Sequence, residues 1–546
     1  MAPVQNEDEL KLAPLALVTS HFVAASYLIY KVGRSLYKSH KNLSPSQDTR
    51  LRVAQRTKLT TTFGTLAVLG LVFAVNSTYK YLKLSYDVWA SERGIGVPDS
   101  PFSTSRWAGT NVTSTTQLHL RQWLSDTPIY LDALEILTEK SRRLWWGQQL
   151  DLATISWTTL LAIEGRRRNI PHLWAYALLA HLVSLSFAQN LFYVALISIP
   201  SPLPSRKRTL LSRFFPPKPN NWLPNYPVII SCLVLNYAVS MWLPYAAGTS
   251  SFPAAASLGK LLSLAPLALN VVAPQSWGSV HRTPHSSYRV ITIIFQFISA
   301  ASAFLHAKNT LTGLFYNLPE PNRHRHSIKI PFDVEKRSRW ERSTTSIEKV
   351  LGSINDHPAV TAAGKDVLLS ALSLGLWAAV RAVDVGNILR SAMPLYKSNQ
   401  EIPVDGRERP ALPEPEVQAE KQSSEHPNGT SMTLRRSGRR TRGKTESIDG
   451  SNGSIHLDDF QTPKRRSRPR KAKGSLEASP EVDPSLDADN AAYKPTVTEK
   501  EELELGDVVP DDDFDWESAS LAWALTVLGG LGMGSAAVFG GTCISR

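Results

Sequence analysis

Cysteine is nearly absent from this chain, and the structures that depend on cysteine are excluded with it. The 546 residues include only Cys232 and Cys543, which lie far apart in apolar surroundings. Two such residues supply neither a disulfide framework nor a cysteine metal site. The first ten residues are acidic rather than basic, so we expect no cleavable signal peptide.

The chain also lacks the common motifs of nucleotide-binding and hydrolytic sites. It has no phosphate-cradling glycine loop and no Gly-x-Ser-x-Gly nucleophile elbow. The histidines of NRHRH (322–326) have no carboxylate or cysteine partner at a fixed spacing. The DDDFD run (511–515) lies in an acidic stretch beside an apolar segment, which argues against a magnesium-diphosphate motif. We therefore predict no metal and no cofactor.

Long apolar runs, by contrast, are plentiful. About 20 apolar residues are needed to cross a hydrocarbon layer of roughly 30 Å. Residues 367–383 are interrupted near their end by Arg381 and Asp384, whereas 519–541 are rich in small residues, as in closely packed membrane helices. The predicted fold class is all-α, a multi-pass transmembrane helical bundle of about 7–9 helices. The other runs are 12–30, 59–78, 150–164, 172–199, 224–246, 257–274 and 290–307.

The composition changes sharply after residue 395. Residues 396–515 are rich in Pro, Ser, Glu, Lys and Arg and have few aromatics, so we predict a disordered charged tail. The predicted organisation is a transmembrane domain (1–395), this tail, and a C-terminal transmembrane anchor (516–546). Basic clusters at 434–444 and 463–473 would let the tail contact anionic lipid, acidic proteins or nucleic acid.

The distribution of basic loops predicts the orientation in the membrane. Loop 31–58 holds eight Lys/Arg residues against the single Asp48, so we expect it in the cytosol and the N-terminus in the lumen. Residues 79–149, which include the sequon Asn111-Val-Thr, would then be lumenal. Loop 201–222 is also basic, yet alternation of the predicted spans places it in the lumen. The sequence leaves this conflict open.

The charged tail is predicted to be cytosolic or nucleoplasmic, because its basic clusters favour that side. This prediction requires 367–383 to lie in the interface or against the bundle without crossing. The last helix would then place Arg546 in the lumen.

The segment 142–176 surrounds one carboxylate with arginines and aromatics. Arginines and aromatics are typical of helix ends at the membrane boundary, and Glu164 would simply pair with the neighbouring Arg166–Arg168. Alternatively, Glu164 faces the bundle interior as an acid or a substrate ligand, as intramembrane ionisable groups do by default. His181, Gln189 and Asn190 follow within an apolar run. Each of them alone favours a role in joining helices, but their concentration favours a site.

Four blocks of this chain resemble fungal multi-pass membrane proteins, among them the membrane-bound terpene cyclases of the ascofuranone type. The resemblance covers roughly residues 10–390 and is most specific in EGRRR-x-IPHLWAY. The chain departs from the compact family pattern by its long charged tail and its last apolar segment. The four blocks are SYDVWASERG (85–94), WLSDT (123–127), RRLWWGQQL (142–150) and LLAIEGRRRNIPHLWAYALLAHLVSLSFAQNLF (160–192).

The resemblance implies an acid-initiated cyclisation of an epoxidised or olefinic prenyl chain in fungal secondary metabolism. Such a reaction needs a carboxylic acid held neutral by its membrane surroundings. The candidate acids are Glu164, Asp151 and Asp126. Aromatic faces would steady the carbocation, and a long apolar substrate would enter from the bilayer. The candidate substrate-binding residues are Trp145, Trp146, Trp157, Trp174, Tyr176, Phe187, Gln189 and Asn190.

The alternative is a non-enzymatic membrane protein of the endoplasmic reticulum or nuclear envelope. In this interpretation the helices are a scaffold, and the basic disordered tail recruits acidic partners or chromatin. The side on which the tail lies discriminates between the two hypotheses. The sequons Asn428-Gly-Thr and Asn452-Gly-Ser report it, because only a lumenal asparagine is glycosylated.

Overall fold

The computed structural model describes residues 12–41, 50–95, 119–198, 218–281, 284–325, 333–381, 383–394 and 514–544. This part of the chain is an all-α, multi-pass bundle, as the sequence predicts. Six of its helices are long and apolar enough to cross a membrane, or seven if a bent pair counts as one span. The predicted disordered tail lies outside the described residues up to residue 513, together with Asn111 and both basic clusters.

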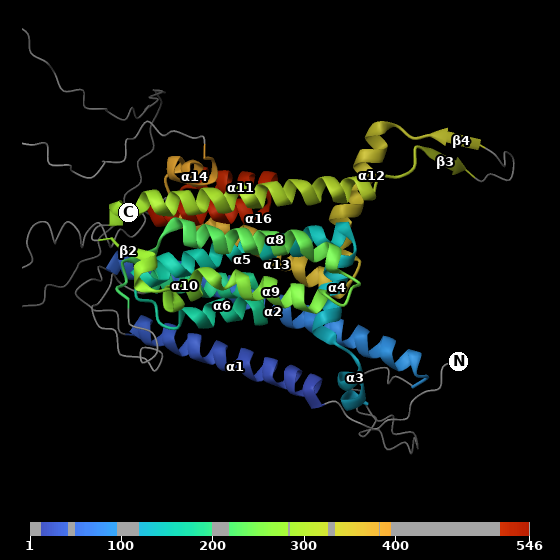
Figure 1. Ribbon diagram of the computed structural model, residues 1–546, viewed down its shortest axis with the longest axis horizontal. Helices are drawn as coiled ribbons and strands as arrows, with labels where there is room; N and C mark the ends of the chain where they lie inside the picture. The colour runs from blue at the N-terminus through green and yellow to red at the C-terminus, as the bar shows by residue number, and fades with distance from the viewer. Residues whose placement is uncertain are drawn as a thin grey trace, which may run out of the picture. The chain divides into compact units, whose positions relative to one another are not determined.

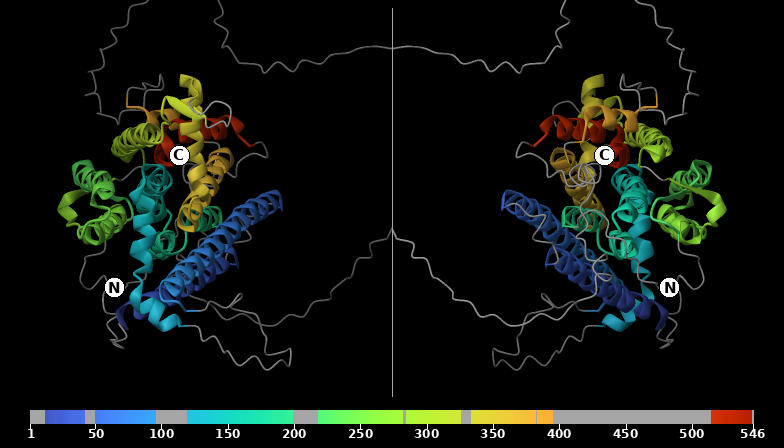
Figure 2. Two further views of the ribbon diagram at one scale, coloured as in Figure 1. Left: turned by 90° about the vertical axis from the view of Figure 1, so that its right-hand side faces the viewer. Right: turned by 90° about the vertical axis from the view of Figure 1, so that its left-hand side faces the viewer.

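The helices lie side by side between two ends of the bundle (Figure 1). We name the left-hand end in this view the arginine end, because it holds Arg166–Arg168 beside β1 (Trp222–Pro224), which pairs with β2 (Gly278–Val280). The right-hand end is the α4 end, with α3 (Leu120–Asp126), α4 (Ile129–Glu139) and α12 (Arg339–Gly352). Figure 2 looks along the bundle and shows α1 and α2 on one flank.

The long helices run from one end to the other. Helices α9 and α10 are one bent pair, with 63° between them. Helix α5 ends in a π-helical turn, Leu161–Gly165. The elements that extend along the bundle are α1 (Leu12–Lys41), α2 (Arg50–Glu92), α5 (Ser141–Leu160), α8 (Tyr226–Ala246), α9 (Phe252–Ser263), α10 (Ala265–Val272), α11 (Pro284–Tyr316) and α13 (Pro358–Arg381). Shorter elements are the strands β3 (Asn322–Arg325) and β4 (Asp333–Lys336), the 3-10 turns Gln275–Trp277 and Ser353–Asn355, and α14 (Val385–Ala392).

Helices α6 (Leu173–Leu182) and α7 (Leu185–Ser198) form a hairpin that does not cross the bundle. Their 10 and 14 residues extend only about 15 and 21 Å, less than the roughly 30 Å of a span. The rings of Tyr176 and Phe192 lie 5.6 Å apart, and Arg168 Nη1 donates to the Leu196 carbonyl at 3.0 Å. Helix α7 therefore returns to the arginine end. The sequence predicted one span over 172–199, and the structure replaces it with this hairpin.

Helix α16 (Trp516–Ile544) is also a hairpin, because its backbone breaks at Gly530 with φ 77° and ψ 169°. Near its start, Ser518 Oγ donates to the Val383 carbonyl at 2.5 Å. Near its end, a Cβ at Gly541 would lie 2.7 Å from Val383 Cγ1. Arg167 Nη1 donates to the Cys543 carbonyl at 2.9 Å. Both ends of α16 thus lie at the arginine end, although its length and composition alone would suit a single span.

Buried polar side chains hold α16 in the centre of the bundle. Gln149 Oε1 of α5 accepts a hydrogen bond from the Leu531 backbone N–H at 3.3 Å, just after the break at Gly530. The hydroxyls of Ser156 and Ser535 lie 2.5 Å apart and are both buried. Such contacts join helices where water is absent. The predicted C-terminal anchor is therefore a packed core element that folds back at its middle.

The predicted segment 367–383 was expected not to cross the membrane, and here the structure differs. Its residues up to Arg381 form the second part of α13, which runs from the α4 end to the arginine end and is largely buried. Asp515 N–H donates to the Ala379 carbonyl at 3.2 Å, so the residues before α16 lie beside the end of α13. Arg381 is the last residue of the helix, where a charged group can reach the membrane boundary.

Candidate functional site

A cavity of about 300 Å³ lies beyond the tip of the α6–α7 hairpin. The hairpin fills only part of the bundle's depth, so a space remains between its tip and the α4 end. Helices α1, α2, α4 and α13 enclose this space. Its wall is mostly apolar and includes Val18, Phe22, Phe73, Leu82, Ile129 and Leu137.

Asp366 of α13 lines the cavity and caps the hairpin tip. Its Oδ2 accepts a hydrogen bond from the Leu185 backbone N–H at 2.9 Å, and its Oδ1 accepts one from the Ser186 N–H at 2.8 Å. The first N–H groups of a helix lack partners within the helix and favour negative charge. Asp366 therefore caps the N-terminus of α7 from another helix, beside Ser184, whose Oγ accepts from the Phe187 N–H at 3.2 Å, and it ties the hairpin to α13.

Further polar groups line the same cavity. Ser77 of α2 is 2% exposed, and its hydroxyl has no hydrogen-bond partner within the described residues. The Lys365 ammonium lies 5.3 Å from the centre of the Phe73 ring, and the His21 ring lies 5.2 Å from that of Tyr130. A buried hydroxyl without a partner costs about 1–3 kcal/mol. A ligand that hydrogen-bonds to Ser77 would recover that cost.

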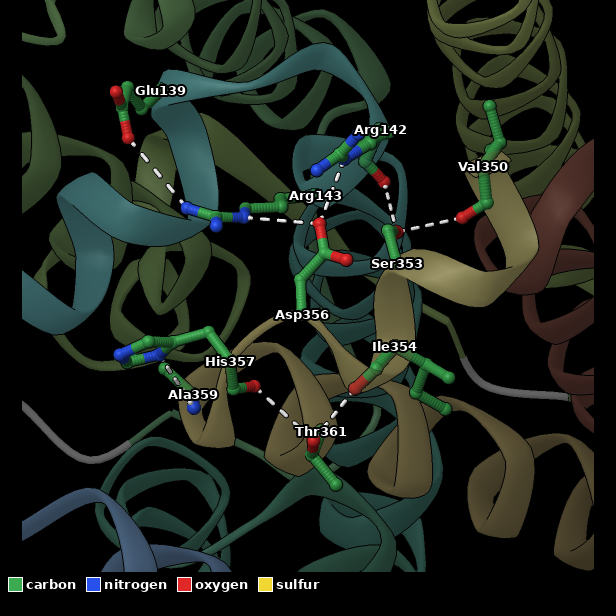
Figure 3. Close-up of polar contacts among 10 residues, drawn as sticks. All are labelled: Glu139, Arg142, Arg143, Val350, Ser353, Ile354, Asp356, His357, Ala359 and Thr361. Carbon is green, nitrogen blue, oxygen red and sulfur yellow. Dashed lines mark hydrogen bonds and ion pairs between the residues drawn. The ribbon is translucent and has the colours of Figure 1, made fainter. Parts of the chain in front are cut away.

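A polar cluster at the α4 end fixes the start of α13, which forms part of the cavity wall through Ala359 (Figure 3). Asp356 Oδ2 accepts from Arg142 Nε at 2.8 Å and lies 3.6 Å from Arg143 Nε. His357 Nδ1 accepts from the Ala359 N–H at 3.2 Å. Burial, with a further contribution from Arg143, lowers the pKa of His357 below its usual value, so the neutral acceptor form is favoured.

Glu164, the first candidate acid, lies outside this cavity and within a set of ion pairs. It is fully buried in the π-helical turn, 2.9 Å from Arg168 Nε and 3.8 Å from Arg167 Nη1. Arg166 donates to the carbonyls of Pro219 and Trp222 and to Asn270 Oδ1. The EGRRR block therefore ties the end of α5 to α7, α10, α16 and β1. In this geometry the carboxyl group of Glu164 lies between two guanidinium groups at the end of α5.

The two other candidate acids lie apart from Glu164 and from the cavity. Asp151 Oδ1 pairs with Lys260 Nζ of α9 at 2.6 Å. Thirteen residues of helix separate Asp151 from Glu164, an axial distance of about 20 Å. Asp126 Oδ2 pairs with Arg93 Nη2 at 2.8 Å on an exposed part of α3. The structure does not bring the three carboxyl groups together.

The candidate substrate-binding residues also lie outside the cavity wall. Asn190 Nδ2 donates to Ser373 Oγ at 2.9 Å, and Gln189 Nε2 donates to the Tyr193 hydroxyl at 2.6 Å, so both amides join helices. Trp174 is 44% exposed beneath the Lys31 ammonium. The remaining aromatics pack in the core or against neighbouring helices: Trp145, Trp146, Trp157, Tyr176 and Phe187.

The sequence contains one signal for the cavity. Two charges, Lys365 and Asp366, lie directly before the apolar segment that begins at 367. Ionisable residues at the edge of an apolar helix are candidates for a functional site. Ser77 carries no comparable signal, because serine is common in membrane helices. Within the described ranges, no group of three or more His, Cys, Asp or Glu residues could hold a metal ion.

No family model, no curated protein and no solved structure matches this chain.

Proposed function

We propose that this membrane protein binds a small amphipathic molecule in the cavity beyond the α6–α7 tip. The ligand would have an apolar chain and a head that forms hydrogen bonds. The proposal rests on the cavity itself, because its wall is mostly apolar and also includes Ser77, Lys365 and Asp366. Its size lies at the lower end of small-molecule sites, which measure about 300–1,000 Å³. The proposed location is the endoplasmic reticulum or the nuclear envelope.

Exposed residues at the cavity rim favour entry of the ligand from the bilayer. Phe22 of α1 is 50% exposed, and Thr78 of α2 is exposed as well. A chain that enters between α1 and α2 would keep its apolar part in contact with lipid or protein throughout. The head would then reach the unpartnered Ser77 hydroxyl.

The experiment uses photoreactive farnesol and photoreactive palmitic acid as probes on the full chain in lipid nanodiscs. Labelled peptides are located by mass spectrometry. We expect labelling in residues 70–82 and 359–366, and loss of that labelling in the cavity-filling variants Ala133→Phe and Ala362→Phe. The matched control is Ala300→Phe, on an exposed position of α11. Equal labelling in wild type and cavity-filled variants would overturn the proposal.

Acid-initiated cyclisation of a prenyl chain is the second candidate function. One observation favours it: a carboxyl group, Asp366, shares the cavity with the rings of Phe22, Phe73, Tyr81 and Tyr130. In this function Asp366, in its neutral form and still accepting the two α7 N–H bonds, would replace Glu164 as the donor of the proton that opens the epoxide. The rings would stabilise the resulting positive charge, and the cyclic carbocation would lose a proton to form an alkene. Terminally epoxidised farnesol is the test substrate. Conversion by wild type and none by Asp366→Asn, with probe labelling retained, would support cyclisation, and absence of conversion by wild type would reject it.

A further inference from the structure

The two ends of the bundle differ strongly in the charge of their short connections. At the arginine end, residues 31–58 hold eight Lys/Arg and one acidic residue, and residues 199–222 hold five Lys/Arg and no acidic residue. At the α4 end, residues 79–141 hold six Lys/Arg and seven Asp/Glu residues. Residues 317–357 hold eight Lys/Arg and six Asp/Glu residues. An excess of Lys/Arg in short loops is typical of the cytosolic side.

The α6–α7 hairpin resolves the conflict over the basic loop 201–222, which alternation of the predicted spans placed in the lumen. With 172–199 as one span, the basic segment 199–222 falls on the side opposite to 31–58. Because α6–α7 returns to its starting end, the described residues on both sides of 199–217 lie at the arginine end with Arg166–Arg168, as do the end of α1 and the start of α2. The Arg168–Leu196 and Arg166–Trp222 hydrogen bonds, each 3.1 Å or shorter, fix this placement.

The connection between α14 and α16 begins and ends at the same end of the bundle. Helix α14 follows α13 at the arginine end, and Gln296 Nε2 of α11 donates to the Arg390 carbonyl at 2.8 Å. On the return, the Phe514 ring lies 5.8 Å from the Lys58 ammonium of α2. The hairpin α16 then brings Cys543 back to Arg167.

We infer that the arginine end faces the cytosol and that the α4 end, with the cavity, faces the lumen. The charged segment 395–513 then lies in the cytosol or nucleoplasm, and residue 544 lies on that side as well. The ligand of the cavity is taken from the lumenal half of the bilayer, a consequence that rests on the proposed function. The orientation itself rests on connectivity and charge and does not depend on any ligand.

Three of the chain's sequons, at Asn111, Asn428 and Asn452, test this orientation directly. Expressed in eukaryotic cells, the full chain should carry one glycan, detected as mass removed by endoglycosidase H. We expect Asn111→Gln to abolish it and the double variant Asn428→Gln/Asn452→Gln to leave it unchanged. A glycan lost only from the double variant would overturn the orientation, and the ligand-binding test above would be unaffected.

A second measurement decides the case in which no asparagine is modified. Epitope tags inserted at residue 105 and at residue 450 are exposed to protease in sealed microsomes. The tag at 450 should be digested and the tag at 105 protected until detergent is added. Digestion of the tag at 105 with protection of the tag at 450 would show the opposite orientation and overturn the inference.

Discussion

Glu164 illustrates how a buried charge acts in this protein. The carboxylate lies between Arg167 and Arg168, whose guanidinium groups also reach the last turns of α16 and α7. Cations near the C-terminus of a helix stabilise its free carbonyl groups. The block EGRRR, which from sequence suggested a catalytic acid, also joins the ends of three helices.

Replacement of Glu164 tests that explanation. Glu164→Gln leaves buried arginines without their counter-charge, and removal of one partner from a buried pair costs about 3–5 kcal/mol. We expect a clearly lower melting temperature for the purified protein in detergent. The matched control is Asp126→Asn, whose exposed pair with Arg93 is worth about 1 kcal/mol or less. A melting temperature equal to that of wild type would contradict the structural role of Glu164.

At the scale of the element, two segments that look like membrane spans are hairpins. Helices α6 and α7 are too short to cross singly, and Asp366 stabilises their turn by capping α7. In α16 the turn depends on Gly530, whose positive φ is one that residues with a side chain rarely adopt. A Cβ there would also lie 2.6 Å from His306 Nδ1.

Gly530→Ala should therefore destabilise the bundle. The strained backbone costs about 1–3 kcal/mol, and the contact with His306 adds to it. We expect a lower melting temperature and faster proteolysis near the break. Gly64→Ala in α2 is the control, because no atom lies within 4 Å of its Cβ position and alanine favours the helix. Equal stability of both variants would mean that α16 tolerates a straight conformation.

At the scale of the whole molecule, the last helix completes the core. Helix α16 packs against α5, α11, α13 and α14, and almost all residues of its second half are buried. Its removal would expose the polar groups of Gln149 and Ser156 together with the apolar residues around them. This role differs from that of a peripheral anchor, which could be deleted without loss of the remaining fold.

Two deletions separate these roles. Truncation after residue 513 should give aggregated protein in size-exclusion chromatography, because the centre of the bundle is left open. Replacement of residues 400–510 by a flexible Gly/Ser linker should give a monodisperse protein, because the start of α16 already contacts the residues between α13 and α14 through Ser518 and Val383. A well-folded truncation product would show that α16 is dispensable.

The sequence by itself determined the membrane class, most of the crossing helices and the unusual character of the 142–176 segment. These follow from composition over some twenty residues, which governs partition into the bilayer. It did not determine which apolar runs turn back. That choice depends on groups remote in sequence, such as Asp366, which lies 181 positions from the Leu185 N–H that it caps. The cavity has the same origin, because it is the space between the tip of the α6–α7 hairpin and the α4 end. Only the tertiary structure decides where the chain reverses.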